Sequence, residues 1–386
     1  MMGRRDYPLG MMDLRIVVVG AGIIGSCLAY ELARAGERVV LTDHGVPGGG
    51  ASAASYAWLN SNSFDDPGYH ALRVLGMSAY ADLAAELGAG EWLHPTGCVR
   101  VAASGTDAKE LRARVARKRA AGYPAQLLEP GQAARTEPAL ARLPAEPAAL
   151  ASFPAEGYVD TTTLIGCLLE RFQALGGVVA RARVTSLLGD GAGVRTTDGD
   201  LAADRVAICA GADTSLLRDA GFELRARGPA GATVITAPVP VRMRGLVHFP
   251  GVTVRPDGGS RLLLHAVDVD ERIEAGGTRL GDAAIGELTG RARAWLGLRA
   301  DDLDVAEVRV SVRPHPPDGF PVTGPVPGAP GAYVVCTHSG VTLAAILARL
   351  VTAEIRTGEA DPLLAPYRPG RFLPAPAPSP APAPRV

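Results

Sequence analysis

Hydrophobic positions follow their most regular pattern near the amino terminus. Residues 16–19 form a short, continuously apolar run, which is typical of a strand buried on both faces of a parallel sheet. Apolar residues then recur with helical spacing over residues 23–32, and the helix is expected to end at Gly36. Residues 38–41 predict a second strand, and Asp43 ends it. The pattern therefore predicts a β-α-β unit.

Two later stretches also predict strands. Gly245–Asp268 alternates as antiparallel strands do, around a Pro-Asp-Gly-Gly turn. Ser311–Gly324 is interpreted as the end of a buried strand followed by a tight corner rich in proline and glycine, and the strand ends on Arg313. A guanidinium is costly to bury without a partner, so this position predicts an anion beside Arg313.

Three glycines stand between the first strand and its helix. Gly20 permits a tight turn, Gly22 lets the backbone approach a pyrophosphate, and Gly25 lets helix and strand pack closely. The helix amino terminus then offers free N–H groups to phosphates. Asp43 follows Gly25 by 18 residues, where a carboxylate accepts hydrogen bonds from ribose hydroxyls. The spacing predicts a dinucleotide site, and a plain strand–turn–helix is the alternative.

The loop after this acid favours FAD over a nicotinamide cofactor. Gly45–Ser63 is rich in Gly, Ser and Ala, whereas a nicotinamide-binding domain usually runs straight into its next β-α unit. Small residues let the backbone pass close to a ligand, and Ser52 and Ser55 can donate to phosphate. The alternative is a flexible surface loop, but Trp58 and Leu59 argue against it.

Composition narrows the function classes. The 386 residues suggest two domains, or one large domain with an insertion. A net charge of -1 offers no basic field for nucleic acid or an anionic membrane, and no apolar stretch is long enough to span a bilayer. The five cysteines are scattered, which argues against a metal site and for a reducing, cytoplasmic location.

The fingerprint and its loop resemble the D-amino acid oxidase superfamily of FAD enzymes, which includes glycine oxidase and monomeric sarcosine oxidase. Glu156–Gly177 resembles the helix before the family's second cofactor strand, with Asp160 as its N-cap. Val184–Ser215 resembles its β-meander, and Arg313–Ile355 resembles its carboxyl-terminal flavin segment. The resemblance covers residues 13 to 365.

This resemblance implies an α/β fold (α+β overall), with a Rossmann-like FAD-binding domain and an interleaved substrate-binding domain built on an antiparallel sheet. The FAD-binding pieces are expected at 13–90, 150–228 and 310–365. The substrate-binding pieces are expected at 91–149 and 229–309. Residues 1–12 are interpreted as a disordered extension and 366–386 as a Pro/Ala-rich tail.

The implied activity is oxidation of the C–N bond of an amino acid or secondary amine. A hydride passes to flavin N5, and the imine is hydrolysed. The electron acceptor is O₂ or, in the alternative of a dehydrogenase with the same fold, a carrier. A third reading is a non-catalytic flavin-binding subunit that uses the tail for interaction. The sequence predicts no oligomeric state.

Site residues are carried over from the family motifs. Arg313 stands where relatives bind a substrate carboxylate; the alternative is a structural arginine paired with an acid such as Asp318. His338 is expected to meet substrate or flavin O4, unless it is a cap or core histidine, and His265 is a weaker candidate. The expected FAD contacts are Gly20, Gly22, Ile23, Ile24, Gly25, Asp43, His44, Ala51, Ser52, Ala57, Trp58, Val184, Gly211, Gly340, Val341, Thr342 and Leu343.

Two departures from the family pattern qualify this picture. Ser311 stands where covalent sarcosine oxidases hold FAD by cysteine, and the first loop has Tyr56, Ala57 and Trp58 where other relatives carry a linking histidine. FAD is therefore expected to be non-covalent. Leu263 occupies the position of an oxygen-activating lysine, so rapid reaction with O₂ is not predicted.

Overall fold

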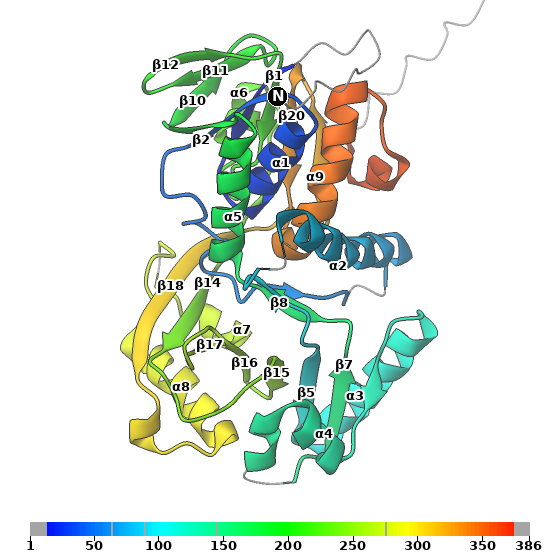
Figure 1. The fold of residues 1–386 in the computed structure, drawn as a ribbon, viewed down its shortest axis with the longest axis vertical. Helices are drawn as coiled ribbons and strands as arrows, with labels where there is room; N and C mark the ends of the chain where they lie inside the picture. Colours follow the sequence, from blue (N-terminus) through cyan, green and yellow to red (C-terminus); the bar gives the residue numbers. More distant parts are fainter. Residues whose placement is uncertain (1–13, 63–64, 89, 144–145, 275, 374–386) are drawn as a thin grey trace, which may run out of the picture.

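The fold is mixed α/β, with two large β-sheets lying one above the other (Figure 1). The predicted extension, residues 1–12, and the last part of the expected tail lie outside the described residues. The computed structural model of the protein describes residues 14–62, 65–88, 90–143, 146–274 and 276–373.

The upper sheet is mainly parallel. In the described chain it consists, in spatial order, of β19 (Val322–Val326), β20 (Ala329–Cys336), β13 (Arg205–Ile208), β1 (Arg15–Val19), β2 (Arg38–Asp43) and β9 (Val178–Arg181). Only β19 runs antiparallel to its neighbour. The apolar runs predicted β1 and β2, and both predictions are confirmed.

Helices cover one face of this sheet and a small meander covers the other. The helices are α1 (Ile23–Arg34), α2 (Pro67–Leu87), α5 (Thr161–Ala174) and α9 (Gly340–Thr357). The meander consists of β10 (Val184–Leu187), β11 (Gly193–Thr196) and β12 (Gly199–Ala202), and α6 (Ser215–Asp219) lies beside it. Asp160 caps α5 as predicted, because its side chain accepts a hydrogen bond from the Thr163 amide.

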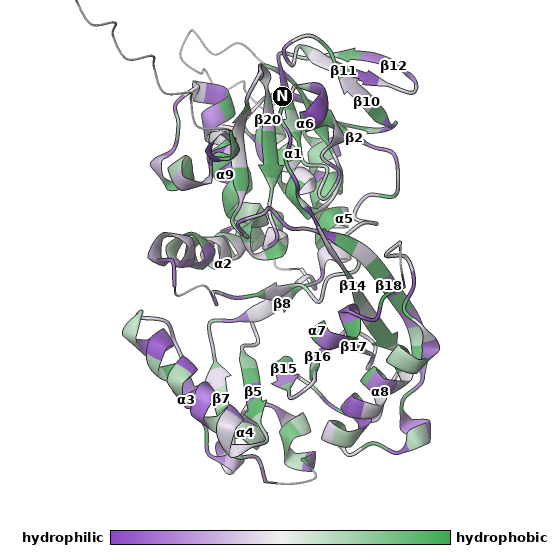
Figure 2. Ribbon diagram, turned by 180° about the vertical axis from the view of Figure 1, so that it is seen from behind, coloured by the Kyte–Doolittle hydropathy of each residue, from purple (hydrophilic) through white to green (hydrophobic). Residues whose placement is uncertain are grey.

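Strand β1 shows why the first apolar run is continuous. Ile16 and Val18 pack among the helices, whereas Val17 and Val19 pack toward the meander. Both faces are therefore buried, which removes the alternation expected of a half-exposed strand. Figure 2 shows the same hydrophobic colouring along the central strands.

The lower sheet is mainly antiparallel. In spatial order its described strands are β18 (Val305–Pro314), β14 (Arg227–Thr236), β17 (Leu262–His265), β16 (Val252–Pro256), β15 (Leu246–Phe249), β5 (Cys98–Ala102), β7 (Ala149–Phe153) and β6 (Gln126–Leu127). The helices beside it are α3 (Gly105–Ala120), α4 (Pro130–Thr136), α7 (Val267–Asp270) and α8 (Asp282–Leu296). The predicted hairpin turn lies between β16 and β17.

A third, short sheet lies between the two large ones. Its strands are β3 (Trp58–Leu59), β8 (Gly157–Val159) and β4 (Leu93–His94). Because β8 follows β7 in the chain and pairs with β3, this sheet connects the lower sheet to the loop after β2.

One local prediction is corrected. The strand that ends near Arg313 is not buried: β18 is an edge strand, paired with β14 alone in the described sheet, and its residues are half-buried or exposed. Farther along the chain, Pro362–Tyr367 and Pro369–Phe372 form 3₁₀ turns. Arg368 anchors these turns by pairing with Glu354 of α9.

Candidate active site

A cavity of about 1200 Å³ opens where the carboxyl ends of β1, β2 and β13 face β18 of the lower sheet. Ligands of open α/β sheets bind outside the carboxyl ends of the strands, so this is the expected position for a cofactor. Gly25 and Leu343 lie outside the cavity lining. The other predicted site residues line it, namely Gly20, Gly22, Ile23, Ile24, Asp43, His44, Ala51, Ser52, Ala57, Trp58, Val184, Gly211, Arg313, His338, Gly340, Val341 and Thr342.

Steric requirements explain two of the glycines. Gly20 has a φ of 101°, and a Cβ there would lie 2.5 Å from the Cys209 carbonyl oxygen. A Cβ at Gly25 would lie 1.8 Å from the carbonyl oxygen of Gly20. Gly25 therefore packs against the backbone of the turn at Gly20 and does not contact the cavity. Only glycine allows β1 and α1 to approach this closely.

Asp43 holds the turn from the end of β2. One carboxylate oxygen accepts from the Ala21 amide at 2.7 Å, and the other accepts from the Gly45 amide at 2.8 Å. The side chain of His44, beside it, is largely exposed. The carboxylate is thus fixed at the rim of the cavity, with lone pairs left to accept from further donors.

The loop after Asp43 is held in place. The Ser52 hydroxyl oxygen accepts from the Ile23 amide at 3.0 Å, at the start of α1, and the Ser52 carbonyl accepts from the Thr161 hydroxyl at 2.8 Å. A flexible surface loop, the alternative from the sequence, does not describe this segment. Ala57 even adopts a φ of 56°, which is uncommon for a residue with a side chain.

The cavity fits FAD in its shape and in its donor set. The amino termini of α1 and α9 both open on it, and neither N-cap residue, Gly22 or Ser339, makes a side-chain cap bond. The first amides of a helix have no intrahelical acceptor, so each end offers donors and partial positive charge to an anionic group. Two buried polar atoms in the lining, Thr337 Oγ1 and Asn62 Oδ1, also lack a protein partner among the described residues.

Arg313 lies on the cavity wall and already has an anionic neighbour. Its Nη2 donates to Asp270 Oδ2 at 2.6 Å and contacts His265 Nε2 at 3.0 Å. Asp318, the acid suggested from the sequence, is the wrong partner because it pairs with Arg371. Among the described residues, Nε and Nη1 of Arg313 have no acceptor, so N–H donors on these two nitrogens remain available.

His338 projects into the cavity just before α9. Burial by the surrounding protein, together with His315, Arg313 and Arg73, lowers its pKa to about 4. Its ring meets that of His315 edge-on, with 4.9 Å between the centroids. At neutral pH His338 is therefore an uncharged imidazole, which can donate one hydrogen bond and accept another.

Sequence reasoning missed Tyr56, Asp270 and Arg73 as site residues. Tyr56 stacks on His265 with 4.6 Å between the ring centroids, and burial raises the pKa of Tyr56 to about 12, so its hydroxyl stays protonated. Asp270 is far from Arg313 in sequence, and no local motif marks it. Arg73 could have been noticed, because it lies on the buried face of α2 together with Tyr69 and Gly76, where a charged side chain is unusual.

Metal-binding clusters and membrane-spanning helices are both absent from the part of the chain that the structure describes. Within the ranges that the structure describes, no group of His, Cys, Asp and Glu side chains could hold a metal ion. None of the described helices is long and apolar enough to cross a membrane.

The chain is similar to known proteins over almost its whole length. A family model described as FAD dependent oxidoreductase matches residues 15–354. Glycine oxidase of Geobacillus kaustophilus is 28% identical over 373 residues, which cover 91% of this chain and 95% of that protein. Glycine oxidase of Pseudomonas putida is 29% identical over 395 residues, which cover 93% and 99%.

Solved structures share the fold. The crystal structure of glycine oxidase from Geobacillus kaustophilus has a TM-score of 0.82 and 26% identity, and covers 94% of this chain and 100% of that chain. L-proline dehydrogenase from P. horikoshii has a TM-score of 0.79 with 18% identity, over 93% and 98%. At that identity the second likeness concerns the fold alone.

Proposed function

The chain belongs to the DAO family of FAD-dependent oxidoreductases, and from this premise we propose that it oxidises the C–N bond of a small amino acid or secondary amine. Bound FAD supplies the redox chemistry by accepting the hydride that leaves the amine-bearing carbon. The nitrogen releases a proton, and water hydrolyses the resulting imine. Because the similar proteins are named as glycine oxidases, the alternative of a non-catalytic subunit is set aside.

The free donors of Arg313 are the observation that carries the substrate assignment. Asp270 holds Nη2, while Nε and Nη1 have no acceptor among the described residues, so their N–H groups can donate to a carboxylate. The Arg313 side chain is 26% exposed, on the wall of the cavity. Asp270 is then a positioning residue, and the anion that Arg313 meets from solution is the carboxylate of an amino acid.

We assign the remaining parts of the cavity to cofactor and substrate as follows. The six-stranded sheet with its helices is the FAD-binding domain, and the eight-stranded sheet is the substrate-binding domain. The first amides of α9 hold the flavin edge that becomes negative on reduction, a stabilisation of about 0.3–2 kcal/mol. Neutral His338 orients substrate or the flavin carbonyl without adding charge. The five cysteines are free, which supports a cytoplasmic location.

The electron acceptor is the open part of this proposal. Leu263 is buried in β17, and neither lysine of the chain, Lys109 or Lys118, lines the cavity. We rank an oxidase first and a dehydrogenase second. Steady peroxide formation during amine turnover identifies the oxidase, whereas flavin reduction without peroxide, and turnover only with an added carrier, identifies the dehydrogenase.

An anaerobic flavin-bleaching experiment tests the proposal. Arg313→Met is compared with wild type on an amino acid and on its decarboxylated amine. Losing one side of a buried charge pair costs about 2–5 kcal/mol, so flavin reduction by the amino acid should slow by roughly 30-fold or more. Reduction by the amine should change little. Equal losses on both substrates, or a loss of stability alone, would show that Arg313 does not bind substrate.

A further inference from the structure

Arg73 is a second arginine on the cavity wall, more deeply buried than Arg313, and none of its bonds reaches a carboxylate. Arg73 is only 8% exposed to solvent and lies on the inner face of α2. Nε donates to the Asn60 carbonyl at 3.1 Å, Nη2 donates to Asn60 Oδ1 at 2.6 Å, and Nη1 donates to Ser339 Oγ at 2.6 Å. All three acceptors are neutral. Within the part of the chain described, Arg73 therefore has no acidic partner, and besides these acceptors its charge meets only the face of the Tyr69 ring, 5.5 Å from Cζ to the centroid.

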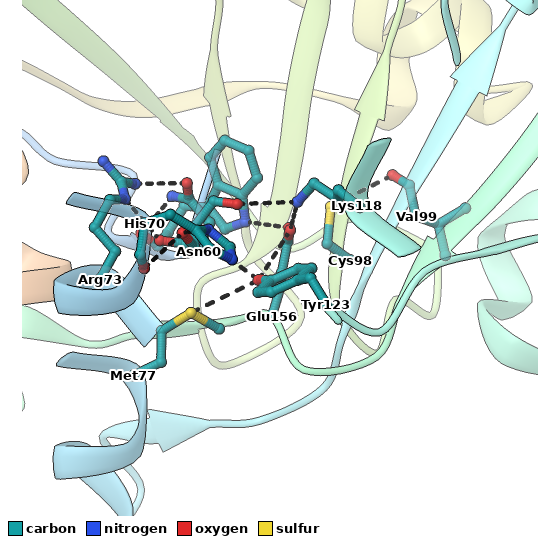
Figure 3. Close-up of polar contacts among 11 residues, drawn as sticks. Asn60, His70, Arg73, Met77, Cys98, Val99, Lys118, Tyr123 and Glu156 are labelled. Carbon is teal, nitrogen blue, oxygen red and sulfur yellow. Dashed lines mark hydrogen bonds and ion pairs between the residues drawn. The ribbon is translucent and has the colours of Figure 1, made fainter. Parts of the chain in front are cut away.

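The neighbours of Arg73 do not supply the missing negative charge. Figure 3 shows Arg73 bonded to Asn60 at one end of a polar cluster and Lys118 bonded to Glu156 at the other. Glu156 is matched by Lys118 at 2.6 Å. Burial, Lys118 and Arg73 lower the pKa of His70, so that ring is neutral at pH 7. The cluster thus keeps one positive charge in excess beside the cavity.

Donors remain for a ligand at this point. A guanidinium has five N–H groups, and the described residues accept three of those of Arg73, which leaves one on each terminal nitrogen. The Ser339 hydroxyl oxygen accepts from both Arg73 and Tyr69, so its own proton is free to be donated. Ser339 also lines the cavity, at the amino terminus of α9.

We propose that Arg73 and Ser339 form a second anion-binding subsite of the cavity, which takes a second carboxylate of the substrate. The inference rests on the proposed function, in which Arg313 binds the first carboxylate. Arg73, Arg313 and His338 all line this one cavity, and both guanidinium charges contribute to lowering the pKa of His338. The preferred substrate is then an amino acid or secondary amine that carries two carboxylates.

Calorimetric titration of the FAD-loaded protein tests this with unreactive probes. Acetate presents one carboxylate, and malonate and succinate present two at different spacings. In wild type, one of the dicarboxylates should bind at least tenfold more tightly than acetate. Arg73→Met should reduce that advantage to about twofold or less and leave acetate affinity within threefold. Arg73→Lys should restore part of it, because an ammonium keeps the charge without the planar fork.

Controls separate this subsite from a structural role of Arg73. Arg349 also joins α9 to α2, through Asp82 and Glu86, but lies away from the cavity lining. Arg349→Met should therefore leave both affinities unchanged. Arg73→Gln keeps neutral hydrogen bonding if Arg73→Met folds poorly, and it should lose the dicarboxylate advantage equally.

The possible failures are distinguishable. If wild type shows no dicarboxylate preference, or if Arg73→Met and Arg73→Gln retain it, the second subsite is wrong. If they instead lower the flavin reduction potential and leave carboxylate affinities alone, the guanidinium serves the flavin, and the proposal is also wrong. If acetate affinity does not depend on Arg313, the fault lies in the proposed function.

Discussion

Arg313 lies flat against β14 because residue 231 has no side chain. A Cβ built on Gly231 would lie 2.0 Å from Nη2 of Arg313 and 2.2 Å from its Cζ. Gly231 is buried, and its register partner on β18 is Ser311. The orientation of the Arg313 guanidinium therefore depends both on the space left by Gly231 and on the ion pair with Asp270.

Gly231→Ala should displace Arg313 without removing any ionisable group. The atoms in the way are the end of a flexible side chain, so the fold and FAD content should be kept. Flavin reduction by amino acids should slow by about tenfold or more, the scale of 1.4 kcal/mol, and decarboxylated amines should be affected less. Rapid-mixing absorbance measures both rates.

A glycine on α8 provides the matched control. A Cβ at Gly290 would meet no heavy atom within 4 Å. Gly290→Ala should leave both rates unchanged and raise stability by about 0.5–1 kcal/mol, since alanine is the better helix former. If Gly231→Ala behaves like this control, the orientation of Arg313 does not depend on residue 231.

His338 predicts a pH dependence of stability. Its pKa is held at about 4 by burial and by neighbouring His and Arg side chains, compared with about 6.5 for an unfolded histidine. Between these values the unfolded chain binds a proton that the folded chain does not. Stability should therefore fall as pH drops from about 6.5 toward about 4, by the linkage of protons to unfolding. His338→Gln should flatten this part of the curve, measured as unfolding midpoints in denaturant.

A histidine at the exposed rim serves for comparison. His44→Gln removes a largely exposed ring that lines the same cavity. Equal slopes for wild type and His338→Gln would mean that the proton uptake on unfolding in this range comes from other groups.

At the scale of elements, local patterns predicted what lies close together in the chain. The unit β1–α1–β2 is contiguous, so its apolar runs and three glycines were sufficient to predict it. The same holds for the hairpin turn after Pro256. Each of these needs only neighbours within a few residues.

Long-range pairing could not be predicted from such patterns. The strand that ends at Arg313 was expected to be buried, but an edge position is decided by which strands pair with it. Asp270 reaches Arg313 from 43 residues away, through the fold alone. Arg73 was missed although it lies between Leu72 and Gly76 on a buried stripe of α2, because no local motif marks it.

The position of Ser311 on β18 predicts how FAD is held. Ser311 lines the cavity but has no thiol that could form a thioether. Acid precipitation of the yellow protein should therefore release all of its flavin as intact FAD, which chromatography of the supernatant measures. A fluorescent protein band on a denaturing gel would contradict this.

At the scale of the whole molecule, the two large sheets meet at a buried ion pair. Lys118 of α3 lies on the side of the lower sheet, and its Nζ contacts Glu156 at 2.6 Å and the Ser61 carbonyl at 3.3 Å. Glu156 also accepts from the indole N–H of Trp58 at 2.9 Å. Trp58 and Asn60 line the cavity, so this pair supports the cavity wall from behind.

Replacing one member of this ion pair should destabilise the fold more, per residue changed, than replacing both members together. Lys118 and Glu156 are each 1% exposed, so one left alone is an uncompensated buried charge. Lys118→Met or Glu156→Gln should each lower the free energy of unfolding by about 3–5 kcal/mol, and the double variant should lose clearly less than their sum. Denaturant unfolding of the FAD-loaded protein measures this cycle.

The exposed pair Arg195–Asp200 is the control, and Asp200→Asn should change stability by no measurable amount. Additive losses in the double variant would mean that the two charges stabilise the junction independently, and that the polar cluster behind the cavity does not act as a unit.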